Sequence, residues 1–255
     1  MIRSLVLFIL ITALLIAPVF APYDPYTTDP VNQLTPPNAL HLFGTDLLGR
    51  DVLSRWLHGG ARTLSLALLA TSVGLSIGLM FGIITGANKT GVTLVIDVFM
   101  RALLSLPALM IALVFVTLLG SGGATVAVAV GLAQVAPTSQ VIRTAVEIIN
   151  HADYVMAARG MGASSMRLMR FVLIPNIAPI LRAYGGVVFG YCLLNAAALN
   201  FLGLGGEPST PDWGMMLYEG RVASRTAPWI ALFPGLAITM TVILVSWATQ
   251  DRPRG

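Results

Sequence analysis

Residues 102–142 read ALLSLPALMIALVFVTLLGSGGATVAVAVGLAQVAPTSQVI, a run of 41 residues without Asp, Glu, Lys or Arg. A transmembrane helix needs about 20 apolar residues and rises about 1.5 Å per residue, so this run is long enough to cross a bilayer twice. Residues 120–123, Gly-Ser-Gly-Gly, lie near its middle and favour a turn. The stretch therefore predicts two helices that cross a membrane in opposite directions.

Four more uncharged runs flank this one, and each is long enough for one crossing. They cover residues 4–23, 63–88, 183–206 and 226–250. Because the runs are continuously apolar and do not alternate as barrel strands do, they predict an all-α integral membrane protein with six transmembrane helices. With 56% hydrophobic and 10% charged residues, the composition excludes a soluble domain and a disordered chain. The lone Cys192 excludes a disulfide scaffold and a Cys-based zinc site.

Basic residues are distributed unevenly between the segments that join these helices. If the N-terminus is cytoplasmic, ten Lys and Arg residues lie inside and five outside, whereas four acidic residues lie inside and seven outside. This bias predicts a multi-pass protein with both termini in the cytoplasm, and it explains the net charge of +4 without a nucleic-acid partner. The first run also resembles a signal peptide, but Pro22 would hinder cleavage after Ala21, so an uncleaved span is expected.

The predicted organisation has three parts. They are the first transmembrane helix in residues 1–22, an extracytoplasmic loop in residues 23–62, and a five-helix core in residues 63–255. Pro22 just before the loop and four prolines in its first half disfavour regular structure there. Thr45 or Asp46 is then expected to cap a short helix that ends near His58 and rests on the membrane surface.

Two segments of the core lie between spans. The cytoplasmic segment 143–182 contains five arginines, two acidic residues and several methionines, with glycines at 160 and 162 between two helical pieces and prolines at 175 and 179 near its end. This composition favours a surface buried against a protein partner, and an ordinary inter-helix loop is the alternative. The extracytoplasmic loop 203–229 contains Trp213 and Trp229, whose usual role would be to anchor the chain at the lipid headgroups.

The predicted spans lack the groups that most membrane chemistry needs. They contain no Asp, Glu, Lys or Arg, and the three histidines lie outside them or at their ends. Proton-coupled transport is therefore disfavoured, whereas sodium coupling through hydroxyl and backbone oxygens stays open. The chain has no His-Glu-x-x-His or Gly-x-Ser-x-Gly motif, and residues 86–90 lack the glycine before the lysine that a phosphate loop requires. We expect no catalytic residue, no metal site and no cofactor bound by this chain.

Polar side chains inside the spans are candidates for a translocation path. They are Gln134, Gln140, Tyr191, Asn195 and Asn200. A polar group in hydrocarbon needs a partner, so each of these either joins two helices or lines a hydrated path. The sequence leaves both roles open.

Three motifs carry a resemblance to a known family. Residues 42–55 read LFGTDLLGRDVLSR and follow the first span. Residues 157–162 read AARGMG and are followed by VLIPN at 172–176. Residues 200–205 read NFLGLG and are followed by PDWGMM at 211–216. In this order and at these topological positions, the motifs resemble those of the dipeptide, oligopeptide and nickel permeases of ATP-binding-cassette (ABC) importers.

The resemblance implies a type I (MetI-like) ABC importer transmembrane domain without catalytic activity of its own. The implied partners are a homologous second permease subunit, two ABC ATPase subunits that bind ATP and magnesium, an extracytoplasmic solute-binding protein, and the lipid of a bacterial or archaeal plasma membrane. The coupling helix would cover roughly residues 153–167. The implied ATPase-coupling residues are Tyr154, Met156, Ala157, Ala158, Arg159, Gly162, Arg167 and Pro175. The implied binding-protein contacts are Asp46, Arg50, Asp51, Asp212 and Trp213.

Two features depart from the family pattern. Met156 replaces the acidic residue that opens the coupling motif, and the tail after the last run is shorter than is usual in this subfamily. Neither a charge contact at position 156 nor a tail contact with the ATPase is therefore carried over. Peptides are the favoured solute, with nickel or a metal chelate as the alternative. A stand-alone carrier or channel and a purely structural scaffold are the competing classes.

Overall fold

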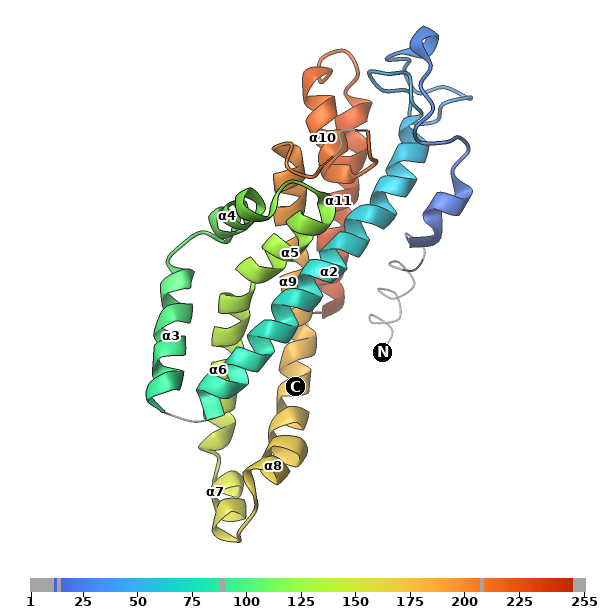
Figure 1. Ribbon diagram of the computed structural model, residues 1–255. Helices are drawn as coiled ribbons and strands as arrows, with labels where there is room; N and C mark the ends of the chain where they lie inside the picture. Colours follow the sequence, from blue (N-terminus) through green and yellow to red (C-terminus); the bar gives the residue numbers. More distant parts are fainter. Residues whose placement is uncertain (1–11, 13–14, 88–89, 207–208, 250–255) are drawn as a thin grey trace.

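The computed structural model describes residues 12, 15–87, 90–206 and 209–249. These residues form an elongated bundle of helices, with α7 and α8 at one end and α10 toward the other (Figure 1). The helices are η1 (Ala17–Phe20), η2 (Pro30–Asn32), α2 (Val52–Ala87), α3 (Gly91–Leu104), α4 (Ala108–Leu119), α5 (Gly123–Ala133), α6 (Val135–Asn150), α7 (Asp153–Gly160), α8 (Ser165–Leu168), the π-helix η3 (Met169–Leu173), α9 (Ile174–Phe201), α10 (Trp213–Val222) and α11 (Trp229–Thr249). The described residues contain one isolated β-bridge and no extended strand, and the all-α prediction is confirmed.

Up to five of the six predicted spans lie within the described residues. Four helical stretches are long and apolar enough to cross a membrane, and they are Val52–Ala87, Gly123–Asn150, Ser165–Phe201 and Trp229–Thr249. A fifth candidate is the pair of α3 and α4, which is bent by 100° at a short break. The predicted first span, residues 1–22, falls mostly outside the described residues.

The turn predicted within residues 102–142 is present. It joins α4 to α5, and Gly120 and Gly122 have φ values of +93° and +149°, which glycine adopts without strain. The first of the two predicted helices differs from the prediction, because it is divided into α3 and α4, and α3 begins before the uncharged run and includes Asp97. A buried carboxylate is tolerated there because Arg101 and Arg143 both form ion pairs with it.

The short surface helix predicted for residues 45–58 is not a separate element. A turn occupies its first half, and α2 begins at Val52 and continues unbroken through the second predicted span. Asp51 caps this start, since its carboxylate accepts the backbone N–H three residues further on at 2.7 Å. The glycine at position 60 stays helical and leaves room for the start of α10: a Cβ there would lie 2.7 Å from the Trp213 ring.

The predicted segment 143–182 is also divided differently. Its beginning is the end of α6, which runs to Asn150, and its last nine residues, 174–182, belong to α9. Pro175 does not end a helix; it lies at the start of α9 directly after the π-helix η3, and the helical stretch Ser165–Phe201 continues through it. The part that projects beyond the long helices is therefore α7, a turn and α8.

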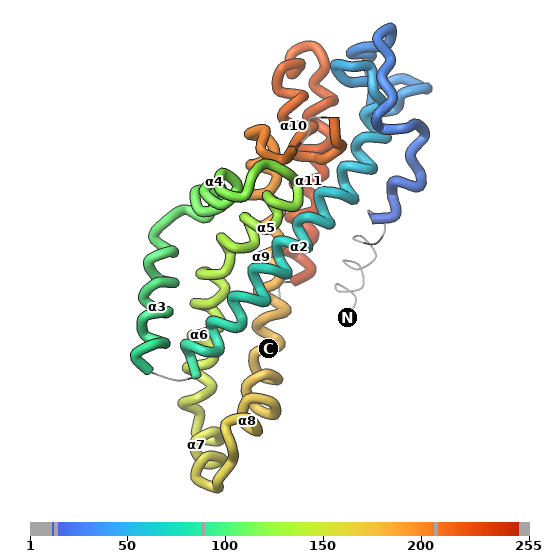
Figure 2. Tube along the Cα trace, in the orientation of Figure 1, coloured from blue at the N-terminus to red at the C-terminus, as the bar shows by residue number. Residues whose placement is uncertain are grey.

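The most extensive helix contact is between α2 and α6, which lie along one another over the second half of α2 (Figure 2). Four glycines of α2 recur every four residues at this contact, and they are Gly74, Gly78, Gly82 and Gly86. The side chains that face them also recur every four residues, and they are Gln134, Thr138, Ile142 and Val146. A Cβ on any of the four glycines would lie 2.5 to 2.9 Å from its neighbour, so the two backbones approach closely. We call this contact the glycine seam.

Candidate functional site

The first candidate site is the hairpin of α7 and α8, which forms one end of the molecule (Figure 1). Gly162 makes the turn with a φ of +85°, and nothing lies within 4 Å of a Cβ placed on it. Ser164 then caps α8 by accepting the N–H of Arg167. Gly162 is therefore required for its backbone conformation, which a larger residue would strain.

Apolar side chains of this hairpin point in two directions. Val155 and Leu168 are buried, at 1% and 9% exposed. Five large apolar residues of the hairpin and of η3 directly after it are instead 53% to 83% exposed, and they are Tyr154, Met156, Met161, Met166 and Phe171. We call these five residues the hairpin face. An exposed apolar surface of this kind is typical of an interaction site, and methionine side chains adapt to a partner.

The residues predicted to couple to an ATPase all lie on this hairpin or directly after it. Tyr154, Met156, Ala157, Arg159, Gly162, Arg167 and Pro175 are exposed, and Ala158 is half-buried. Their exposure makes them available to a partner protein. Their role in coupling stays a prediction.

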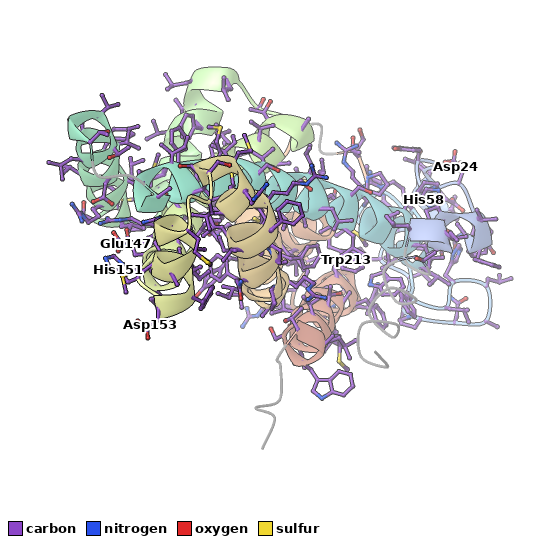
Figure 3. The ribbon with its side chains drawn as sticks, turned by 90° about the horizontal axis from the view of Figure 1, so that it is seen from below. Asp24, His58, Glu147, His151, Asp153 and Trp213 are labelled. Carbon is purple, nitrogen blue, oxygen red and sulfur yellow. The ribbon has the colours of Figure 1, made fainter. Side chains whose placement is uncertain are left out.

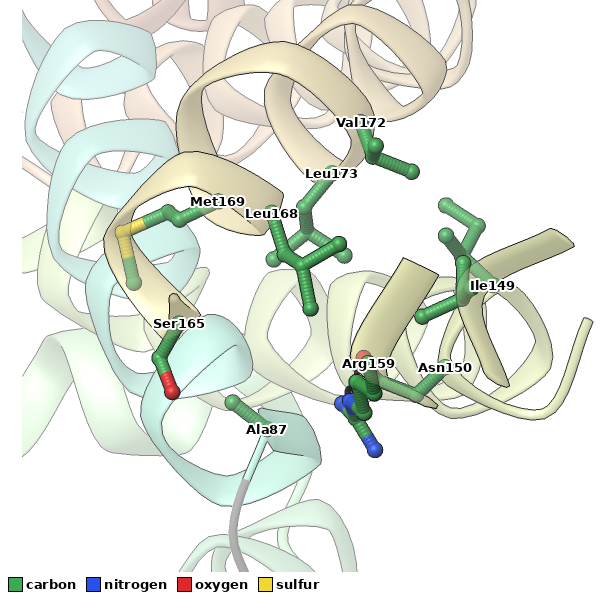
Figure 4. A pocket seen from close by; sticks show the side chains of 10 residues that line it. Ala87, Ile149, Asn150, Arg159, Ser165, Leu168, Met169, Val172 and Leu173 are labelled. Carbon is green, nitrogen blue, oxygen red and sulfur yellow. Dashed lines mark hydrogen bonds between the residues drawn. The ribbon is translucent and has the colours of Figure 1, made fainter. Parts of the chain in front are cut away.

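A small pocket of about 90 Å³ lies between the hairpin and the ends of α2 and α6 (Figure 4). Within it, Asn150 donates a hydrogen bond from Nδ2 to the Gly86 carbonyl at 3.3 Å and accepts one from Arg159 at 3.0 Å. Ligand sites usually enclose about 300 Å³ or more. The pocket is therefore a small gap between packed helices and not a ligand site. The sequence alone does not indicate the contacts of Asn150.

The second candidate site lies where the segment before α2 meets α10. Asp46 pairs with Arg50 at 2.7 Å and with Arg55. Glu219 of α10 pairs with Arg55 at 2.5 Å and with Arg50 at 3.1 Å. We call these four residues the charge cluster, and their side chains are 1% to 11% exposed. Buried charges are costly unless paired, and here two positive and two negative groups pair with one another, with the buried Arg55 Nε left without a hydrogen-bond partner.

Asp212 forms a second polar contact at this end. Its carboxylate accepts hydrogen bonds from Thr63 of α2 and Asn200 of α9, both at 2.8 Å, and it caps α10 by accepting the Gly214 N–H at 2.8 Å. Asp212 therefore joins three helices.

Trp213 follows Asp212 and is 1% exposed. Its ring N–H donates to the Trp56 carbonyl at 2.9 Å. In Figure 3 Trp213 lies among the helices, whereas Glu147, His151 and Asp153 lie at the edge of the molecule. The prediction of a headgroup anchor is wrong for this residue, because the ring fills the core beside the close contact at Gly60.

The binding-protein contacts implied by the resemblance are not surface groups in this structure. Asp46, Arg50, Asp51, Asp212 and Trp213 are all 1% to 4% exposed. Their charges and ring N–H are bonded within the chain; Asp51, for example, also pairs with His41 at 2.9 Å. These side chains shape the loops at this end and do not form its outer surface.

Arg55 and Glu219 complete the charge cluster; in the sequence Arg55 ends a family motif and Glu219 is one of the extracytoplasmic acidic residues, with nothing to pair the two. They are 164 residues apart, so no local pattern could pair them.

The loop before α2 contains a turn at Asp29. Hydrogen bonds from the Asn32 amide and then from the Val31 N–H lower the pKa of the Asp29 carboxyl.

The polar residues proposed for a translocation path separate into two groups. Gln134 and Asn200 are buried, the first in the glycine seam and the second bound to Asp212. These two join helices. Tyr191 is 57% exposed, and Asn195, half-buried, donates to the Tyr191 carbonyl one turn earlier on the same face of α9. Gln140 is half-buried on α6. These three residues keep a path-lining role as a prediction.

No group of three or more His, Cys, Asp or Glu side chains that could hold a metal occurs among the described residues.

Ion pairs also connect α3 to α6. Asp97 of α3 pairs with Arg101 at 2.7 Å and with Arg143 of α6, and Arg143 also pairs with Glu147 at 3.2 Å. This arrangement neutralises charge between α3 and α6.

Comparison with known families decides the class of the protein. Residues 78–250 match the family described as the binding-protein-dependent transport system inner membrane component, which is more than half of the chain. The chain belongs to this family. It is a multi-pass membrane protein, as its apolar helices indicate.

Curated relatives in this family match over nearly the whole chain. The chain is 35% identical over 248 residues to the di/tripeptide transport system permease protein DppC of Pseudomonas aeruginosa (strain UCBPP-PA14), covering 95% of this chain and 82% of that protein. It is 33% identical over 244 residues to the glutathione transport system permease protein GsiD of Escherichia coli O6:K15:H31 (strain 536 / UPEC), covering 95% and 80%.

Solved structures of ABC transporters share the fold. An inward-facing structure of the MetNI methionine ABC transporter aligns with a TM-score of 0.64 at 17% identity, covering 76% of this chain and 93% of that chain. An amino acid ABC transporter aligns with a TM-score of 0.59 at 20% identity, covering 76% and 91%. The resemblance to ABC importer permeases and the predicted MetI-like fold are confirmed.

Proposed function

We propose that this protein is the permease subunit of an ATP-driven importer and forms half of the path by which peptides, delivered by a solute-binding protein, cross the membrane. The observation that carries the proposal is the exposed hairpin face on a chain of this family. The subunit itself is not catalytic; ATP and magnesium would be bound by two ATPase partners.

The hairpin face fits a protein partner better than it fits lipid. Exposed arginines, Arg159 and Arg167, lie on the same short helices as its methionines, and Met with Arg is a combination enriched at protein interfaces. Exposed Ala157 adds a small side chain that lets a partner approach the backbone of α7. Because Met156 carries no charge, docking at this position would depend on shape and apolar contact.

The same proposal assigns an orientation. The hairpin would lie in the cytoplasm, where ATP is available, and the α10 end would face the solute-binding protein. The excess of basic residues in the segments on the hairpin side supports this orientation of a plasma-membrane protein with both termini in the cytoplasm. A homologous second permease subunit would form the other half of the path.

The names of the relatives support peptides as the solute. One relative is named for di- and tripeptides and another for glutathione, which is itself a tripeptide. Nickel or a metal chelate remains the alternative, and no observation in the structure favours it.

The test is reconstitution of the tagged chain with the proteins that co-purify with it in mild detergent. We expect a second permease and two ATPase subunits, and ATP-dependent uptake of a labelled dipeptide when loaded binding protein is added. Uptake by the chain alone without ATP would overturn the proposal in favour of a carrier or channel. Stimulation by nickel or a nickel chelate, with none by dipeptide or glutathione, would overturn the choice of solute.

A further inference from the structure

We propose that Asn150 is a positioning residue that fixes the α7–α8 hairpin to the α2–α6 pair, so that a displacement of the hairpin moves both helices together. The inference rests on the proposed function, because it takes the hairpin to receive the movement of an ATPase.

Asn150 lies one helical turn beyond the α6 residues of the glycine seam. The residues of the seam that precede it on the α6 side recur every four positions, at 134, 138, 142 and 146, and Asn150 is the next step. It donates to the carbonyl of Gly86, the last glycine of the seam on α2. The last four carbonyls of a helix have no partner within the helix, so this bond caps the end of α2.

The other end of the Asn150 amide binds the hairpin. Its Oδ1 accepts from Arg159 of α7 at 3.0 Å, and the two side chains lie against each other at the pocket (Figure 4). The bridge needs a side chain that donates and accepts at the same time, which a carboxamide does and a carboxylate or an apolar group does not. Without this bridge, the pocket of about 90 Å³ would separate α7 from the end of α2.

The close packing of the glycine seam explains why a displacement at one end of α2 and α6 would be transmitted along both helices. Helices packed this closely do not deform gradually; they shift as a unit. The far end of α2 carries Arg55, which is bound to Glu219 of α10. A rigid α2 therefore connects the hairpin to the end that would face the binding protein, and Asn150 supplies a hydrogen-bonded contact between the hairpin and α2.

The experiment compares Asn150→Ala and Asn150→Asp with the wild type in the complete reconstituted complex. We expect both variants to retain the ATPase subunits and to lose coupling, with uptake per ATP hydrolysed falling about 3- to 10-fold. Asn150→Asp can still accept from Arg159 but cannot donate to Gly86, so it tests the α2 contact in a side chain of nearly the same shape.

Thr144→Ala is the matched control. Its hydroxyl is exposed on the same helix and bonds only to the carbonyl of Gln140 one turn earlier, so wild-type coupling is expected. If the wild type is coupled and both Asn150 variants keep the wild-type ratio of uptake to ATP hydrolysis, the inference is overturned. If Asn150→Ala does not assemble, Asn150→Asp decides. If the wild-type complex itself shows no ATP-dependent uptake, the proposed function fails, and this inference fails with it.

Discussion

The two ends of the molecule place their side chains in opposite ways. At the α10 end, four charged residues of the charge cluster are buried and paired with one another. At the α7 end, five large apolar residues are exposed on the hairpin face. The α10 end is thus completed by contacts within the chain, whereas the surface at the α7 end would be completed by another protein.

This difference predicts that substitutions at the two ends change different properties of the protein, namely its stability and its binding to a partner. A buried charge depends on its partners, so substitutions at the α10 end should change the free energy of unfolding. An exposed side chain makes few contacts, so substitutions on the hairpin should leave that free energy nearly unchanged and alter binding instead. Four substitutions test this division.

The largest effect is expected for Glu219→Ala in the charge cluster. The change leaves Arg50 and Arg55 with Asp46 as their remaining acidic partner, and an uncompensated buried charge costs about 3–5 kcal/mol. The free energy of unfolding of the purified chain in detergent, measured by chemical denaturation, checks this.

Arg221→Ala is the control on the same helix. Arg221 is exposed and lies over the rings of Tyr218 and Phe201, an interaction that contributes about 0.5–1 kcal/mol. Equal losses in the two variants would show that the cluster has no special role in stability.

A smaller loss, about 2–3 kcal/mol, is expected for Asp212→Ala, which removes a helix cap and leaves the buried donors of Thr63 and Asn200 unpaired. Asp212→Asn keeps one carbonyl oxygen as acceptor and should lose less. The same denaturation experiment measures both. An Asn variant as unstable as the Ala variant would indicate that the negative charge, and not the hydrogen bonds, stabilises this contact.

The glycine seam is the region between the two ends, and Gly78→Ala tests it. The added methyl group would lie 2.5 Å from the Thr138 side chain, and overpacking of this kind costs about 1–2 kcal/mol. Gly190→Ala on α9 is the control, because its nearest neighbour would be 3.8 Å away. A stable Gly78→Ala variant would mean that α2 and α6 can separate, which would weaken the argument for a rigid pair.

The same contrast explains what the sequence predicts and what it does not. Uncharged runs predict spans well, because hydrocarbon excludes charge over a fixed length, and the turn at residues 120–123 lies where the glycines place it. The glycines at 160 and 162 also predict the break between two helical pieces, and Gly162 adopts a positive φ there. The single coupling helix over residues 153–167 that the resemblance implies is divided at this break into α7 and α8. These features depend on neighbouring residues.

The sequence alone does not show contacts between residues that are far apart in the chain. Arg55 pairs with a residue 164 positions away, and Asn150 binds the end of α2 64 positions away. A sequence shows these residues as charges or amides without showing their partners. For the same reason, the family motifs indicate Asp46 and Trp213 as contacts on an outer surface, although the structure buries both side chains.

The smallest change in stability is expected for Ala157→Trp on the exposed side of α7. The new ring would point away from the chain, so the free energy of unfolding should stay within about 0.5 kcal/mol of the wild type. Recovery of the ATPase subunits with the tagged chain should nevertheless fall sharply, because the ring would occupy the space that a docked partner needs. Position 157 is a better test than Gly162, where a larger residue would also strain the turn. A variant that is both stable and fully able to retain the ATPase would show that α7 does not dock closely, and the exposed methionines would then need another partner.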